Sequence, residues 1–156
     1  MSIDRSARIR SMARVTLGGA LVVAGIGHVS FARESFQAQV PDWVGIDKDV
    51  VVVLSGLVEI ALGAGLIFVR RRRALFGLAV GLFFVAVFPG NISQFVDGDD
   101  AFGLASNSAR RARLFFQPVL VAWAWWSTGA IDALKRRREP PASWRVGWGD
   151  DGSSDR

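Results

Sequence analysis

Residues 54–69 read LSGLVEIALGAGLIFV, an apolar run with one carboxylate, Glu59, in its middle. Four apolar blocks of this kind occur along the 156 residues. Each is about 20 residues long, the length that an α-helix needs to cross the hydrocarbon layer of a bilayer. Only helices and closed barrels satisfy all backbone polar groups in lipid, and these blocks lack the strict alternation of barrel strands. The sequence therefore predicts an all-α integral membrane protein that folds as a four-helix bundle.

The apolar blocks divide the chain into three predicted parts. A basic arm covers residues 1–11, a membrane domain covers 12–134, and a basic tail that becomes disordered covers 135–156. Within the membrane domain, the predicted helices lie at about 12–32, 50–69, 74–95 and 114–134. The first block, which ends in Ser30-Phe31-Ala32, also fits a cleaved signal peptide. Its apolar stretch is longer than a usual signal core, which favours an uncleaved anchor.

The basic residues predict the orientation. They gather in the N-terminal arm, in residues 70–73, which are four consecutive arginines, and in residues 135–138. A four-span topology brings these three tracts to one side, and the positive-inside rule makes that side the cytoplasm. We therefore expect a cell-membrane protein with both termini in the cytoplasm. Because topology explains the basic tracts, the net charge of +5 does not indicate a nucleic-acid partner.

The composition excludes several kinds of chemistry. The chain has no cysteine and a single histidine, His28. Disulfides, thiol catalysis and thiolate-held clusters are therefore excluded, as is a bis-histidine haem or zinc site within one chain. We predict no metal site and no intrinsic cofactor, so any redox chemistry must come from a bound small molecule or a protein partner.

Five polar residues of the predicted helices fall in the outer half of the bilayer. A rise of about 1.5 Å per residue places His28 roughly 7 Å and Glu59 roughly 13 Å from the outer face. Asn91 lies near the outer end of the third helix, and Gln117 follows Arg113 by one turn on the same face of the fourth. A carboxylate in lipid costs several kcal/mol, so Glu59 should face protein. These residues are its candidate partners.

Small and aromatic residues support this convergence. Glu59 shares a helix face with Ser55, Gly56 and Gly63, whose small side chains let a neighbouring helix approach. The third helix carries one stripe of glycine, aromatic and amide residues at helical spacing: Gly77, Gly81, Phe84, Phe88 and Asn91. The spacing of its two glycines fits a close helix contact, within one chain or between two.

Two further features of the third and fourth helices bear on the site. Pro89 cannot donate a backbone hydrogen bond and frees a carbonyl near Val85. Trp123, Trp125 and Trp126 lie in the middle of the fourth helix, where consecutive positions point different ways. At most one or two of them can therefore line a pocket. The polar network itself has two interpretations, which the residues leave open: a ligand or proton site, or a lock between helices.

The polar motifs together resemble a known family. AGIGHVSF resembles the histidine-containing end of the first helix of DoxX-like membrane proteins, and VPDWV resembles the proline-bearing loop that follows. SGLVEIALGAGL is similar to the second-helix pattern, FPGNI to the third-helix signature, and RLFFQPVLVAW to the opening of the fourth helix. The resemblance runs from about residue 12 to 134. It implies a four-helix membrane bundle, with some members serving quinone-linked sulfur oxidation and others membrane redox or oxidative-stress complexes.

The leading hypothesis combines the resemblance with the polar residues. We expect an outer-half pocket that binds an apolar molecule with a polar head, such as a quinone, in a subunit associated with an oxidoreductase. The expected roles are proton handling by Glu59 and His28, charge balance by Arg113, orientation of the head by Asn91 and Gln117, and apolar contact by Phe84 and Phe88. The alternative is a non-catalytic membrane scaffold that recruits a redox protein partner. A small-solute carrier ranks last, because four spans are few for transport.

Overall fold

The computed structural model describes the backbone of residues 2–37, 39–97 and 107–138, and the side chains of 5–37, 39–93 and 114–138. Within these residues the chain forms helices and no β-strand, so the all-α prediction is confirmed. The elements are α1 (Ser2–Val29), α2 (Arg33–Gln37), the 3-10 helix η1 (Asp42–Val44), α3 (Lys48–Phe68), α4 (Arg73–Asp97), α5 (Asn107–Thr128) and α6 (Ala130–Arg138).

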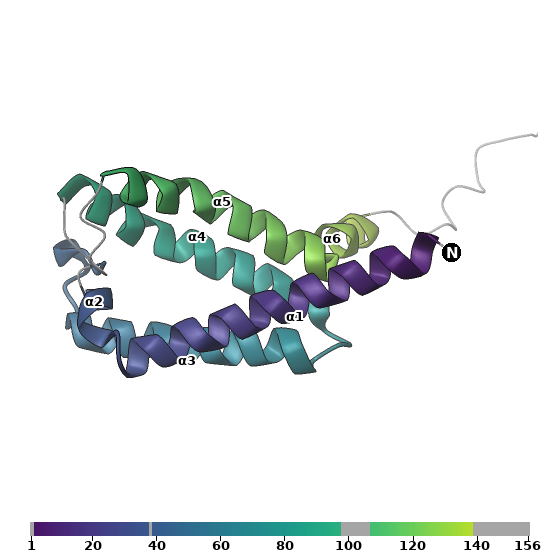
Figure 1. Cartoon of the computed structure of the whole chain (residues 1–156), viewed down its shortest axis with the longest axis horizontal. Helices are drawn as coiled ribbons and strands as arrows, with labels where there is room; N and C mark the ends of the chain where they lie inside the picture. The colour runs from purple at the N-terminus through teal and green to yellow at the C-terminus, as the bar shows by residue number, and fades with distance from the viewer. Residues whose placement is uncertain (1, 38, 98–106, 139–156) are drawn as a thin grey trace, which may run out of the picture.

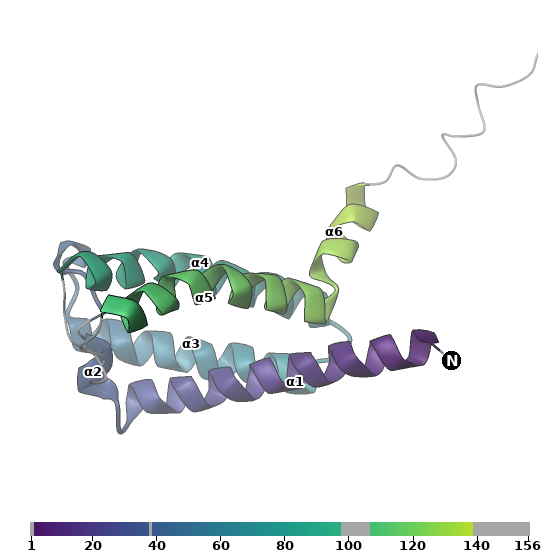
Figure 2. The same ribbon diagram turned by 45° about the horizontal axis from the view of Figure 1, so that its top comes forward.

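The four long helices run alternately up and down in two layers (Figure 1). Helix α1 packs most extensively against α3, and α4 packs most extensively against α5. Figure 2 shows these two pairs as separate layers, one above the other. The short elements α2 and η1 lie at one end of the layers, beside the start of α3 and the end of α4, while the N-terminus of α1 lies at the opposite end.

Glycines bring the two helices of the lower layer into close contact. A Cβ added at Gly18 would lie 2.8 Å from the carbonyl oxygen of Gly63, and one added at Gly25 would lie 2.5 Å from that of Gly56. The two glycine pairs are spaced by two turns on both helices, as antiparallel packing requires. The prediction that small residues near Glu59 permit close helix approach is therefore confirmed.

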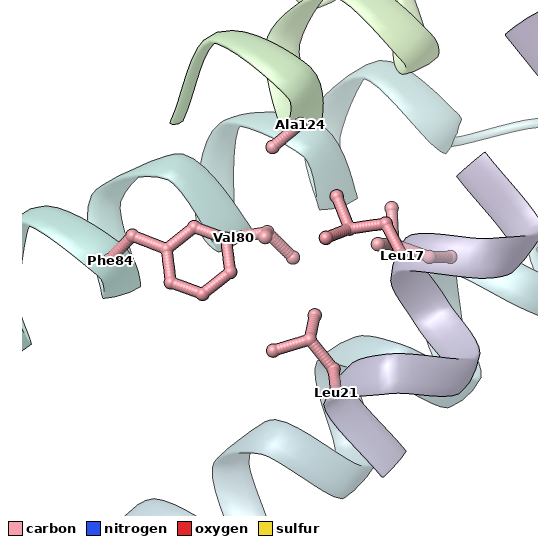
Figure 3. Close-up of a cluster of buried hydrophobic side chains, with 6 residues drawn as sticks. Leu17, Leu21, Val80, Phe84 and Ala124 are labelled. Carbon is pink, nitrogen blue, oxygen red and sulfur yellow. The ribbon is translucent and has the colours of Figure 1, made fainter. Parts of the chain in front are cut away.

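Glycines of α4 do the same in the upper layer. A Cβ added at Gly77 would lie 1.9 Å from the hydroxyl oxygen of Thr128, and one added at Gly81 would lie 2.1 Å from the indole nitrogen of Trp125. The glycine pair of α4 is therefore used inside the chain, against α5. Between the layers lies a core of buried apolar side chains, most of them labelled in Figure 3: Leu17, Leu21, Leu66, Val80, Phe84 and Ala124.

Three described helices are long and apolar enough to cross a bilayer: Arg5–Val29, Lys48–Phe68 and Arg73–Ser93. A fourth span is possible only if two helices are counted as one, Leu114–Thr128 with Ala130–Arg138, which are bent by 67° relative to each other. Large apolar side chains point outward from the spans; Val23, Leu54 and Leu82, for example, are more than half exposed. Such an apolar exterior is compatible with lipid around the bundle.

The helix boundaries differ from the predicted ones in four places. The predicted helix at 114–134 is not continuous, because Gly129 adopts φ 70° and ends α5. That left-handed conformation suits glycine, and it turns α6 away from α5. The predicted arm at 1–11 is helical from residue 2 as part of α1, and the first link contains α2 and η1, which were not predicted. The predicted tail is helical to residue 138, and residues 139–156 lie outside the described residues.

Candidate functional site

A cavity of about 410 Å³ lies between the two layers at the end that carries α2 and η1. Helices α1, α3, α4 and α5 and the link at 36–44 all contribute to its wall. Most of the wall is apolar. The polar members are His28, Gln39, Ser55, Glu59, Asn91 and Gln117. Four of the five polar residues that the sequence singled out therefore reach one cavity.

His28 and Glu59 form the polar centre of the lower layer. Both residues are buried, with 8 % and 9 % of their surface exposed. The Nδ1 atom of His28 lies 2.9 Å from the carbonyl oxygen of Ala24 and 3.2 Å from Oε2 of Glu59. Because a carbonyl oxygen only accepts, Nδ1 must carry the hydrogen. The Oε2 atom itself accepts no hydrogen bond from the described part of the chain.

An aromatic ring from the first link fixes the imidazole. The rings of His28 and Phe36 are stacked, with centroids 3.5 Å apart and planes 16° from parallel. Phe36 belongs to α2, which the sequence did not predict. The stack and the bond to Ala24 together hold the imidazole in one orientation beside the carboxylate.

A chain of hydrogen bonds joins α4 to α5 on the opposite wall. Asn91 donates from Nδ2 to Oε1 of Gln117 at 2.9 Å, and Gln117 donates from Nε2 to the carbonyl oxygen of Phe84 at 2.6 Å. The sequence placed the available carbonyl near Val85, one turn before Pro89. The observed acceptor is its neighbour Phe84, because that carbonyl lies on the stripe that faces α5.

The sequence analysis missed Gln39, which contributes a second buried polar atom without a partner. Its Nε2 atom is buried and forms no hydrogen bond with the described residues. Gly90 permits its position, because a Cβ added there would lie 2.6 Å from the carbonyl oxygen of Gln39. Gln39 lies in a link without helical periodicity, so no sequence pattern assigned it to the cavity. The cavity thus has an unused acceptor, Glu59 Oε2, and an unused donor, Gln39 Nε2.

Ion pairs hold the link against the start of α3. Arg33 of α2 forms a two-pronged ion pair with Asp49, which also accepts from Gln37 at 2.9 Å. The hydrogen bond to Asp49 raises the pKa of Arg33. Lys48 lies 2.6 Å from Asp42 and lowers the pKa of that carboxyl. These contacts hold the link, which forms part of the cavity wall, against the start of α3.

One predicted site residue, Phe88, does not join the described cavity, and the position of another, Arg113, relative to the cavity is not described. Phe88 is half-buried but is not part of the cavity wall, whereas Phe84 is buried and is. The side chain of Arg113 lies outside the described residues, although its backbone belongs to α5. Among the described side chains, no group of three or more histidine, aspartate or glutamate residues is placed to bind a metal ion.

The three tryptophans of α5 lie away from the cavity. Trp123 donates from Nε1 to the carbonyl oxygen of Ala13 at 3.1 Å and so ties α5 to α1. Trp125 lies over Gly81, and Trp126 is 46 % exposed. These rings pack helices together or face outward.

Comparison with known proteins gives one family. The sequence pattern of Domain of unknown function (DUF8561) matches residues 17–128. The chain belongs to the DUF8561 family. The match to DUF8561 encloses every residue that lines the cavity, while the arginines at 5–14 and the C-terminal basic tract lie outside it. No curated protein and no solved structure matches the chain significantly. Nothing in the DUF8561 match links the chain to DoxX-like proteins.

Proposed function

We propose that the chain is an integral membrane protein of the DoxX-like type, whose cavity binds an apolar molecule with a polar head, such as a quinone. In this proposal the chain has four spans, the bent pair of α5 and α6 being the fourth. Both termini lie in the cytoplasm, and the cavity opens near the outer leaflet. The resemblance of the helix motifs and the apolar exterior of the three long helices support the proposal.

The observation that carries the proposal is the pair of unused polar atoms in an otherwise apolar cavity. Leaving a buried donor or acceptor without a partner costs about 1–3 kcal/mol, and folded proteins rarely tolerate it. Glu59 Oε2 and Gln39 Nε2 are two such atoms, and both residues line the same space. A ligand with one hydroxyl and one carbonyl or second oxygen would satisfy both after a rotation of the two side chains, because both atoms are buried. Ligand cavities of this size characteristically combine apolar walls with a few placed polar groups.

The surrounding groups define how the head would bind. Oε2 of Glu59 is a carboxylate oxygen that lies 3.2 Å from Nδ1 of His28, and it calls for a hydroxyl on the ligand because it can only accept. Gln39 would donate to an oxygen at the other end of the head. Phe36, Trp43 and Phe84 supply aromatic surface for the ring. Glu59 and His28 are then the groups that exchange a proton with the bound hydroxyl, within a membrane subunit that serves an oxidoreductase.

Native mass spectrometry of the detergent-extracted full chain tests the proposal. We expect a co-purified amphiphile on the wild-type protein and its loss in Glu59→Gln, which keeps the side-chain volume but removes the charge. Glu34→Gln is the matched control, because Glu34 is an exposed carboxylate of α2. Equal occupancy in wild type and Glu59→Gln would show that Glu59 does not hold the ligand.

A scaffold that recruits a redox protein partner is the second candidate. It is favoured by the four arginines at 70–73, whose side chains are all exposed at one end of the bundle. A pull-down from membranes separates the two functions. The scaffold predicts that neutralising residues 70–73 abolishes partner capture and that Glu59→Gln leaves it unchanged. The ligand-binding function predicts no effect of the arginines on the co-purified amphiphile.

A further inference from the structure

A buried arginine lies at the end of the bundle opposite the cavity. Arg14 of α1 is only 4 % exposed. Its Nη1 atom lies 3.5 Å from the carbonyl oxygen of Ile67, in the last turn of α3. That carbonyl is one of those that a helix end leaves without a partner, and the negative end of the helix dipole attracts the cation. A guanidinium has five N–H donors, so one long bond uses little of its capacity.

Among the described side chains, the charges that act on Arg14 are of the same sign. No ion pair between described side chains includes Arg14. Arg70 and Arg73 lie on either side of the turn between α3 and α4, which begins just after the Ile67 carbonyl that Arg14 contacts, and their charges act on Arg14. Buried charges in proteins are usually paired, because an isolated one loses its hydration without compensation. Among the described side chains, Arg14 thus has two cations acting on it and no ion-pair partner, and this arrangement calls for an anion.

Arg10, by contrast, has a carboxylate partner for its charge. Arg10 lies one turn before Arg14 on α1, and its Nη1 atom is 3.4 Å from Oδ2 of Asp132 in α6. Its guanidinium also lies 6.0 Å from the ring centroid of Trp126. In the membrane orientation proposed above, the end of α3 lies near the headgroups, and the contact with Ile67 places Arg14 there.

We propose that Arg14, Arg70 and Arg73 form a binding site for the phosphate group of an anionic phospholipid. Guanidinium groups match phosphate oxygens in a forked, two-bond geometry that lysine does not offer. The buried Arg14 would bind the phosphate from the inner side of the site, and the exposed Arg70 and Arg73 would bind it from the outer side. The inference rests on the membrane insertion proposed above and is independent of what the cavity binds.

Lipid titration of the delipidated full chain, followed by native mass spectrometry, tests the site. The two probes are phosphatidylglycerol and phosphatidylcholine, which share acyl chains and differ in net charge. We expect one phosphatidylglycerol to bind at least about tenfold more tightly than phosphatidylcholine, as expected for several cations near one phosphate. The double variant Arg70→Gln/Arg73→Gln should lose this preference. Both residues are exposed, so their replacement leaves the fold intact.

The matched control is Arg71→Gln/Arg72→Gln, which removes the same charge from the same turn. It should change the affinity by less than about threefold, because an exposed charge contributes little by itself and neither Arg71 nor Arg72 acts on Arg14. An equal loss in the control pair would show diffuse attraction and overturn the site. Displacement of the lipid by inorganic phosphate would reassign it to a free anion. Equal binding of the two lipids would refute the site alone, whereas binding of neither would also refute membrane insertion.

Discussion

At the residue scale, the carboxylate of Glu59 lies against the His28 imidazole, yet its Oε2 atom accepts no hydrogen bond from the described residues. The His28 imidazole is fixed by Ala24 and Phe36, and its N–H points mainly at the Ala24 carbonyl. One carboxylate oxygen, Oε2, is therefore buried 3.2 Å from Nδ1 of His28 without accepting a hydrogen bond from the described residues. A purely structural lock between helices would be expected to use both oxygens. The unused one is what favours a ligand site.

The opposite wall differs, because there the polar groups satisfy one another. Gln117→Leu should lower the free energy of unfolding by about 1–3 kcal/mol, since it deprives the Phe84 carbonyl of a buried donor and Asn91 of its acceptor. Thermal unfolding in detergent measures the change. Phe115→Leu, at a 78 % exposed position two residues away, is the control and should change it by less than about 0.5 kcal/mol. Equal stability of Gln117→Leu and wild type would mean that the hydrogen-bond chain does not stabilise the α4–α5 contact.

At the element scale, the crossing of α1 and α3 sets the distance between the imidazole and the carboxylate. Gly56 lies directly beneath the imidazole-bearing residue, because a Cβ added to it would be 2.6 Å from Cβ of His28. His28 and Glu59 thus meet only as long as residue 56 has no side chain. The glycines of the two helices are part of the site, although none of them contributes a polar side chain to it.

Gly56→Ala should therefore push α1 from α3. We expect a loss of about 1–3 kcal/mol in the free energy of unfolding, the usual range for overpacking, together with weaker ligand binding. Thermal unfolding and ligand occupancy by native mass spectrometry measure the two effects. Gly19→Ala is the control, because no atom lies within 4 Å of a Cβ added there. If Gly56→Ala behaves like Gly19→Ala, the close crossing is not what positions His28.

The break between α5 and α6 also belongs to this scale. Gly129→Ala places a side chain at φ 70°, which costs roughly 1 kcal/mol relative to glycine. We expect the variant to unfold at a lower temperature than wild type, measured by circular dichroism in detergent. Gly19→Ala again serves as the control, since its glycine lies within a regular helix. An unchanged or raised unfolding temperature would indicate that the helix continues through residue 129.

The sequence predicted those parts of the site that obey helical periodicity. Glu59, the small residues beside it and the stripe of α4 follow from a 3.6-residue period and from the cost of a charge in lipid. Gln39 and Phe36 were not predictable in this way, because they lie in a link whose fold depends on tertiary contacts such as Arg33 with Asp49. The break at Gly129 was missed because hydropathy continues through it, and only the backbone conformation ends the helix.

At the scale of the whole molecule, two helix pairs enclose a cavity at one end and gather arginines at the other. The four-span topology predicts that these ends lie on opposite sides of the membrane. The chain has no cysteine, so the labelling of a single introduced cysteine shows on which side of the membrane that residue lies. In intact cells, a membrane-impermeant maleimide should label Ile46→Cys and spare Arg71→Cys, which become equally reactive once the cells are opened. Both positions are exposed. Labelling of both before lysis would contradict the topology.

Ligand binding at the Glu59 carboxylate is the central claim, and its most direct test is titration of the purified protein with a short-chain alkyl hydroquinone. Trp43 lines the cavity, so quenching of tryptophan fluorescence follows binding. We predict saturable binding to wild type and to Glu34→Gln, and at least about tenfold weaker binding to Glu59→Gln, because the charged acceptor for the hydroxyl is lost. Equal affinity for wild type and Glu59→Gln, or no saturable binding to either, would contradict the account.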